Sequence, residues 1–324
     1  MSLLGPDLAY AGAMLLLAAT LLLFARGIFA RLARYDVDGQ LVVADNPAVG
    51  VSLFGFLGGV IIAVAGILAT DEHDGLKRTL GWDVFETLAF GVLAILLLRL
   101  AGVINDRLIL HNCENKKELV EDRNVGVGAL LCGSYLASGL VLAGAFSGRL
   151  PLIAKGTSKW ASLGVEAGVA VGAFLAAQLV LVLYGQLYQR ISKHHPLVAI
   201  ENDYEVNGVR YGGNTAAGIA MGGNLAAVGV ILWGACRGDI YDWGHFALRF
   251  ALITGVGLLL LVLWRALVIK VFFRKLDLNR EIYVDRNSNA ALLEAAALIG
   301  FAVALALVLG NLADIAGLGA PITR

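Results

Sequence analysis

Residues 46–68 read NPAVGVSLFGFLGGVIIAVAGIL, an asparagine followed at once by a glycine-rich apolar run. The arrangement returns three times, in the stretches NVGVGALLCG, NTAAGIAMGG and NSNAALLEAA, which begin at Asn124, Asn214 and Asn287. A charged, polar linker precedes each asparagine, and another long apolar run precedes each linker. The sequence therefore reads as four copies of one helical hairpin.

The composition indicates that these runs lie in a membrane. The chain has 324 residues, of which 59% are hydrophobic and 15% are charged, whereas a soluble domain carries about 25% charged residues. In lipid, solid apolar runs pair their backbone groups as helices, because a barrel needs alternating strands. We expect an all-α integral membrane protein with eight spans, at residues 8–30, 48–69, 84–108, 125–147, 162–190, 214–236, 244–273 and 288–310.

Basic residues indicate which ends of the spans face the cytoplasm. Fifteen Lys and Arg residues lie in the four linkers and the adjoining helix ends, and seven lie on the opposite side. Positive charge marks the cytoplasmic face, so we expect cytoplasmic linkers and both termini on the outer side. Trp82, Trp160 and Trp243 open the third, fifth and seventh spans on that outer side, where aromatic rings sit at the headgroup level.

Small residues recur at fixed places after the linker asparagines, and small residues on one helix face let backbones approach closely. Every hairpin has two spans, so all four copies point the same way. We expect the glycine-rich even-numbered spans innermost and the odd-numbered spans toward lipid. The hairpins would either ring a central axis or form two four-helix halves, residues 1–158 and 159–324. The recurring positions are Gly55, Gly133, Gly223 and Ala296; Gly59, Ala137, Ala227 and Gly300; and Gly66, Gly144, Gly234 and Leu307.

The linkers themselves are short. Apolar residues in 41–43 and 282–284 predict short extended segments there. Neither segment is long enough to form an independent domain.

The asparagine start, the glycine-rich helix after it and the tandem two-span unit together resemble the bacterial inner-membrane family called domain of unknown function 350. The resemblance covers nearly the whole chain, as two fused four-span copies, and rests on Asn46, Asn124, Asn214 and Asn287. It implies a multi-pass protein of the bacterial inner membrane and no established activity. Genes of the family often accompany a membrane-stress protein, polyamine-related enzymes or ion-channel-like genes, which is context without a mechanism.

The four linker asparagines have two interpretations. They could form a ring of polar side chains at the cytoplasmic mouth of a pore. They could also cap the helices that follow, because asparagine accepts hydrogen bonds from the free N–H groups of a first turn. Position and residue type favour capping.

Ionisable residues inside spans are the next candidates. A charge at the centre of a span costs about 2.5–3.5 kcal/mol, so such residues usually face a cavity or a partner. Glu294, two turns into the last span, is the strongest candidate, and its partner would be Arg99 or Arg265. Arg265 lies near the inner end of its span and could instead snorkel to the interface. Glu166 lies about one turn into the fifth span.

Asn224 and Ser134 lie among glycines on even-numbered spans. They could line a polar path through the bilayer. We favour interhelical hydrogen bonds, which are worth about 0.6 kcal/mol each on average.

The sequence carries no P-loop, nucleophile elbow, HExxH or dinucleotide motif. Its three cysteines show no CxxC spacing, and its histidines show no metal-ligand spacing. We therefore expect no enzymatic activity, no cofactor and no metal, and the net charge of zero argues against a nucleic-acid partner.

Two functions remain for a protein embedded in the lipid bilayer. The first, slightly favoured, is an ion or small-solute channel or transporter. The second is a non-transporting scaffold that recruits a cytoplasmic protein through its charged linkers. The sequence leaves open whether the chain forms a homo-oligomer.

Overall fold

The computed structural model of the chain describes residues 4–69, 80–109, 117–148, 150–153, 156–191, 195–201, 204–206, 209–271, 274, 277–315 and 317. Within these residues, eight helices are long and apolar enough to cross a membrane. They confirm the all-α, multi-pass prediction, and their bounds differ from the expected spans by a few residues. They are α1 (Leu4–Leu32), α2 (Pro47–Leu68), α3 (Leu80–Ile104), α4 (Val125–Phe146), α5 (Lys159–Ile191), α7 (Thr215–Cys236), α8 (Trp243–Val271) and α10 (Ser288–Ile315).

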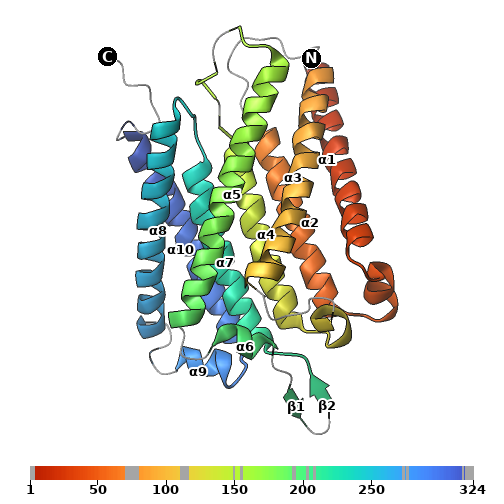
Figure 1. Cartoon of the computed structure of the whole chain (residues 1–324), viewed down its shortest axis with the longest axis vertical. Coiled ribbons are helices and arrows are strands. Elements are labelled where there is room, and N and C mark those ends of the chain that lie inside the picture. The colour runs from red at the N-terminus through yellow and green to blue at the C-terminus, as the bar shows by residue number, and fades with distance from the viewer. Residues whose placement is uncertain are drawn as a thin grey trace.

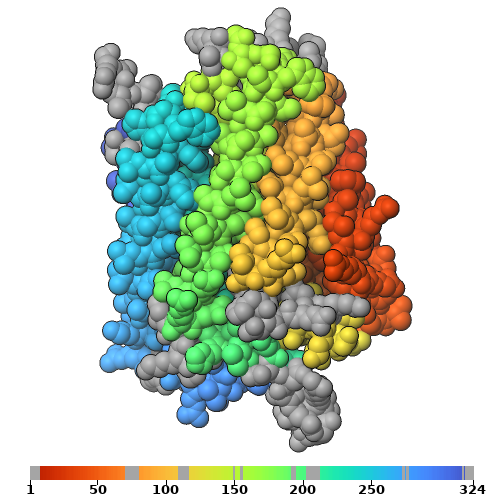
Figure 2. All heavy atoms as spheres, in the orientation of Figure 1, coloured from red at the N-terminus to blue at the C-terminus, as the bar shows by residue number. Residues whose placement is uncertain are grey.

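The helices form two layers (Figure 1). In the inner layer α2 packs on α4, α4 on α7 and α7 on α10, which makes a row with α2 and α10 at its ends. In the outer layer α3 covers α2 and α4, α5 covers α4 and α7, and α8 covers α7 and α10, while α1 packs on α2 and α3. Figure 2 shows α8, α5, α3 and α1 side by side on one face of the molecule.

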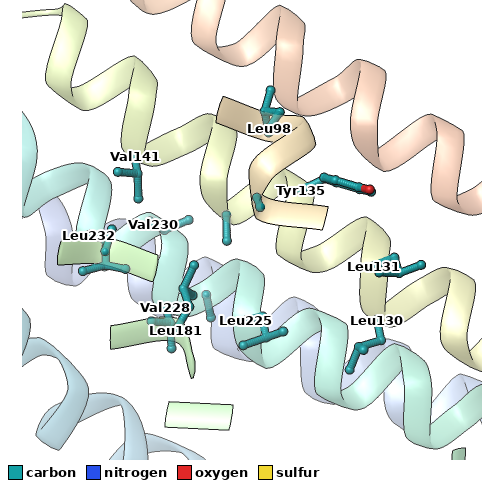
Figure 3. Packing of buried hydrophobic residues seen from close by; sticks show 14 of the residues in the cluster. Leu98, Leu130, Leu131, Tyr135, Val141, Leu181, Leu225, Val228, Val230 and Leu232 are labelled. Atoms are coloured by element: carbon teal, nitrogen blue, oxygen red, sulfur yellow. The ribbon is translucent and has the colours of Figure 1, made fainter. Parts of the chain in front are cut away.

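This open row differs from the ring around a central axis that the sequence allowed. The four even-numbered spans lie innermost, as expected, and their row continues from α4 to α7, whereas the division into halves at residues 158 and 159 stays a prediction. The contact between α4 and α7 is as extensive as the contact between α2 and α4. Buried side chains of α4 and α7, among them Leu130 and Leu225, belong to one continuous core (Figure 3).

The inner helices are in contact backbone to backbone, and the contact has the same register at all three interfaces. The small residue nine positions after one linker asparagine faces the residue eight positions after the next. A Cβ atom added at Gly133 would lie 2.0 Å from the carbonyl oxygen of Gly222, so nothing larger than glycine fits there. The facing pairs are Gly55–Cys132, Gly133–Gly222 and Gly223–Ala295.

The described parts of all four linkers lie at one end of the bundle, here called the linker end, and the start of α1 and the end of α10 lie at the other (Figure 1). A π-helical turn, η2 (Asn105–Ile109), extends α3 toward that end. The other linker elements are η1 (Gly39–Val43), η3 (Lys117–Glu121), α6 (Pro196–Glu201), the antiparallel strands β1 (Tyr204–Val206) and β2 (Val209–Tyr211), and α9 (Leu278–Tyr283).

The prediction of extended segments at 41–43 and 282–284 was wrong. The first lies in η1 and most of the second lies in α9. An aspartate starts each helical turn: Asp36 accepts a hydrogen bond from the N–H of Gly39, and Asp277 accepts from Asn279 and Arg280. These caps satisfy free N–H groups and favour a helical turn over a strand.

Candidate functional site

The linker asparagines do two things at once. Each side-chain oxygen caps the following helix; Asn124, for example, accepts from the N–H of Val127 at 3.2 Å. In the first three copies the side-chain amide also donates to a backbone carbonyl of the next linker. The donor–acceptor pairs are Asn46–Leu119 at 2.8 Å, Asn124–Ile200 at 2.7 Å and Asn214–Ile282 at 2.9 Å. We call this series of bonds the asparagine ladder.

In the first, second and fourth copies the linker asparagine also donates within its own linker. Asn46 donates to the side chain of Gln40, Asn124 to Glu118 and Asn287 to Glu281, all at 2.8–2.9 Å. Each acceptor stands six residues before its asparagine. These acceptors were not predicted from the sequence, although their regular spacing is visible in three of the four linkers.

The residue before each linker asparagine has a left-handed backbone, with φ between 49° and 55° in all four copies. In the third copy this residue is Gly213, where a Cβ atom would lie 1.9 Å from the carbonyl oxygen of Ile200. The other three are Asp45, Arg123 and Arg286. The sharp turn lets each linker return beneath its own helix and meet its neighbour.

Asn46, Asn124 and Asn214 are almost completely buried. They stand in a row along the linker end, as the helices that they cap do. The arrangement joins four linkers into one continuous surface.

A buried ion pair lies between the layers near the linker end. The Nε of Arg265 on α8 bonds the Oε1 of Glu294 on α10 at 2.5 Å. The Glu294 side chain is 0% exposed and that of Arg265 is 23% exposed. The guanidinium also lies over the ring of Tyr188 on α5, whose hydroxyl bonds that of Tyr283 on α9 at 2.8 Å. The sequence left the partner of Glu294 open, and it is Arg265.

Asn224 lies beside this cluster on α7. Its side-chain oxygen accepts from the hydroxyl of Tyr184 at 2.9 Å, and its amide donates to the carbonyl of Ala220. The interaction is an interhelical hydrogen bond from α5 to α7. Tyrosines 184, 188 and 283 had no signal in the sequence, because a tyrosine near a span end is read as an interfacial anchor.

Ser134 belongs to a second buried polar group, which joins η2, α4 and α5. The amide of Asn105 donates to Ser134 at 2.6 Å, and the amide of Gln178 donates to Ser138 at 2.8 Å. Ser138 in turn donates to the carbonyl of Ser134. This chain of bonds connects a helix of the first half with a helix of the second.

Arg99 and Glu166 belong to neither polar group by these contacts. The guanidinium of Arg99 lies 5.3 Å from the ring centre of Phe29 and 5.8 Å from that of Phe56, as cation–π contacts. In the adjoining linker, burial raises the pKa of Tyr35, and the nearby charge of Arg99 opposes the shift. Glu166 is partly exposed near the start of α5, at the opposite end from Tyr188.

The repeated hairpins have a counterpart among known families. The family model described as Domain of Unknown Function (DUF350) matches residues 3–146 and again residues 161–309. The chain belongs to this family. No curated protein and no solved structure matches it.

The two DUF350 matches confirm the prediction of two fused tandem copies. One match ends at the last residue of α4, and the other begins near the start of α5. The asparagine ladder nevertheless crosses from one DUF350 copy to the other, through the bond from Asn124 to Ile200. The two copies are therefore joined at the linker end by the same kind of bond that joins the hairpins inside each copy.

Proposed function

We propose that this protein is a non-transporting membrane scaffold whose linker end faces the cytoplasm and binds a soluble protein. The observation that carries the proposal is the asparagine ladder, which fixes four linkers into one surface. A surface that is ordered before binding loses little conformational entropy when a partner docks. The excess of basic residues on the linker side supports the orientation.

The chemistry of the linker surface supports a protein partner. Val42 and Val43 in η1 are 81% and 86% exposed, although they lie outside the membrane-spanning helices. Exposed acidic residues lie in the first, second and fourth linkers, among them Asp45, Glu121 and Asp285. Apolar side chains with a charged surround are typical of protein-binding surfaces.

The close packing of the inner row supports a scaffold over a channel. Glycines of α2, α4 and α7 touch the backbone of the next helix, so the described inner helices leave no room for a solute between them. The proposal assigns no catalytic activity to the chain.

A photo-crosslinking amino acid placed at Val43 in intact cells tests the scaffold. We expect one discrete soluble protein to be captured there, and none when the crosslinker replaces the lipid-facing Leu175 on α5. Charge reversal at Asp45, Glu121 and Asp285 together should abolish the capture, and Lys159→Glu at the opposite end should preserve it. Capture that survives the triple reversal contradicts the proposal.

Orientation is tested separately in a chain whose own cysteines are replaced. A cysteine at Lys117 should react with a membrane-impermeant maleimide only after the cells are opened. A cysteine at Lys159 should react in intact cells. The opposite pattern would place the linker end outside.

Transport is the second candidate, because a buried ion pair such as Arg265–Glu294 often marks an ion or proton pathway. Liposomes that contain the purified protein, assayed with a panel of ions, test it. Permeability above that of empty liposomes, lost in Glu294→Gln, would favour transport. Permeability that matches empty liposomes for every ion would remove this candidate.

A further inference from the structure

We propose that Glu294 is a proton-binding site inside the membrane layer, and that its protonation state is transmitted to α9 in the fourth linker. The inference needs neither a soluble partner nor transport. It rests on the geometry of the cluster that Glu294 forms with α5, α8 and α9.

The carboxylate of Glu294 is poorly satisfied. Its Oε1 receives a single bond from the Nε of Arg265, and its Oε2 has no hydrogen-bond partner in the described part of the chain. An ionised carboxylate accepts about four hydrogen bonds when fully solvated. A buried charge with so few partners gains by taking up a proton.

The groups that face Glu294 are known from each neighbouring element. Arg265 comes from α8, and Tyr184 and Tyr188 come from α5. Tyr283 of α9 joins the group through its bond with Tyr188. The adjoining α7 contributes the neutral side chain of Asn224 through Tyr184. Among these groups Arg265 alone carries a charge at neutral pH, so it decides whether the carboxylate stays ionised.

Arg265 keeps other partners when Glu294 becomes neutral. Its guanidinium lies 5.4 Å from the ring centre of Tyr188, and its Nη2 is 3.4 Å from the Tyr188 hydroxyl. The side chain is 23% exposed and lies close to the linker end of α8, so the charge can reach water. Protonation of Glu294 therefore does not leave the charge of Arg265 buried without a partner.

A route of hydrogen bonds connects the site with the linker end. Tyr188 bonds Tyr283, which is the last residue of α9. The carbonyls of Ile282 and Tyr283 accept the amide of Asn214, at 2.9 and 3.4 Å. Figure 1 shows α9 at the linker end, on the same side as the lower ends of α8 and α10. Movement of Arg265 toward Tyr188 would therefore shift α9 and the hydrogen bond from Asn214 to Ile282, which is the last bond of the asparagine ladder.

The step is a simple proton uptake. The carboxylate of Glu294 accepts one proton from water on the linker side and forms one O–H bond, and no other bond is made or broken. A proton needs no cavity, which suits a side chain packed at 0% exposure.

Infrared difference spectroscopy of the full chain in lipid nanodiscs tests the site. On mild acidification we expect a carboxylic-acid C=O band to appear in the natural protein and to be lost in Glu294→Gln. Glu166→Gln, on α5, should keep the band, and Glu294→Asp should keep a shifted one if glutamine disturbs folding. A spectrum without a band that depends on residue 294 overturns the proposal.

Hydrogen exchange tests the transmission to α9. After correction for the intrinsic rate, acidification should speed exchange in residues 277–283 several-fold relative to residues 117–121. Tyr283→Phe should remove this change and leave the infrared band in place. An exchange rate in residues 277–283 that stays the same when Glu294 is protonated would overturn the proposed transmission to α9.

Discussion

The side-chain amide of Asn124 donates a hydrogen bond to the carbonyl oxygen of Ile200, 76 residues further along the chain, at 2.7 Å. The same side chain caps α4 through the N–H of Val127. One asparagine therefore starts a membrane helix and ties the first DUF350 copy to the second.

Asn124→Ala should lower the free energy of unfolding by about 2–4 kcal/mol. Loss of a helix cap costs about 1 kcal/mol, and the buried carbonyl of Ile200 loses its donor at a further cost of about 1–3 kcal/mol. Asn287→Ala is the matched control, because Asn287 caps α10 and, in the described part of the chain, its amide bonds Glu281 of its own linker. Denaturant unfolding in mild detergent measures both, and equal costs would contradict the ladder.

Gly133→Ala should destabilise the protein by at least about 1–3 kcal/mol, the usual cost of overpacking. The added methyl group would lie 2.0 Å from the carbonyl oxygen of Gly222 and would force α4 and α7 apart. Gly168→Ala on α5 meets nothing within 4 Å, so it should be neutral or stabilising by up to about 1 kcal/mol through helix propensity. Thermal unfolding midpoints of the two variants distinguish these outcomes.

Gly213→Ala should be far more harmful than Arg123→Ala, although both positions precede a linker asparagine and share a left-handed backbone. The reason is space, since a Cβ atom at residue 213 would lie 1.9 Å from the carbonyl oxygen of Ile200. We expect a loss of yield and of thermal stability for the glycine variant only. Similar behaviour of the two variants would show that the turn, and not the contact, sets the requirement.

Arg265→Gln should cost more stability than Glu294→Gln. Removal of one partner of a buried pair costs about 3–5 kcal/mol, because the remaining charge is stranded. Glu294 is 0% exposed, whereas Arg265 is 23% exposed and retains Tyr188. The double variant Arg265→Met with Glu294→Met should recover most of the loss. Unfolding free energies of the three proteins check this order.

The sequence predicted the spans, the repeat and the asparagine caps, because hydrophobic length and asparagine position are local properties. It did not predict the open row. The decisive clue is at Phe54, eight residues after Asn46, where the later copies have Cys132, Gly222 and Ala295. Only the packing shows that this position faces the preceding helix of the row. The size of the Phe54 side chain therefore could not be interpreted from the sequence.

The candidate site was predicted in part. Glu294 was recognised by its charge, but its partner depended on which outer helix covers the groove between α7 and α10, and the sequence does not encode that directly. The linker turns were predicted as extended because apolar alternation outweighed the aspartate caps. Asp277 shows that a single cap can decide a short segment against its apolar pattern.

When one helix contact repeats along a row, a second molecule could add to the end of the row by the same contact and extend it into a filament. At the positions where α4, α7 and α10 receive a neighbour, α2 instead carries Phe54 and Ile61, with the aromatic ring 67% exposed. Both side chains are larger than their counterparts on α4, α7 and α10, so we expect the α10 edge of another chain not to seat there in the shared register. On this expectation the first hairpin limits growth in the plane of the membrane at the level of single side chains.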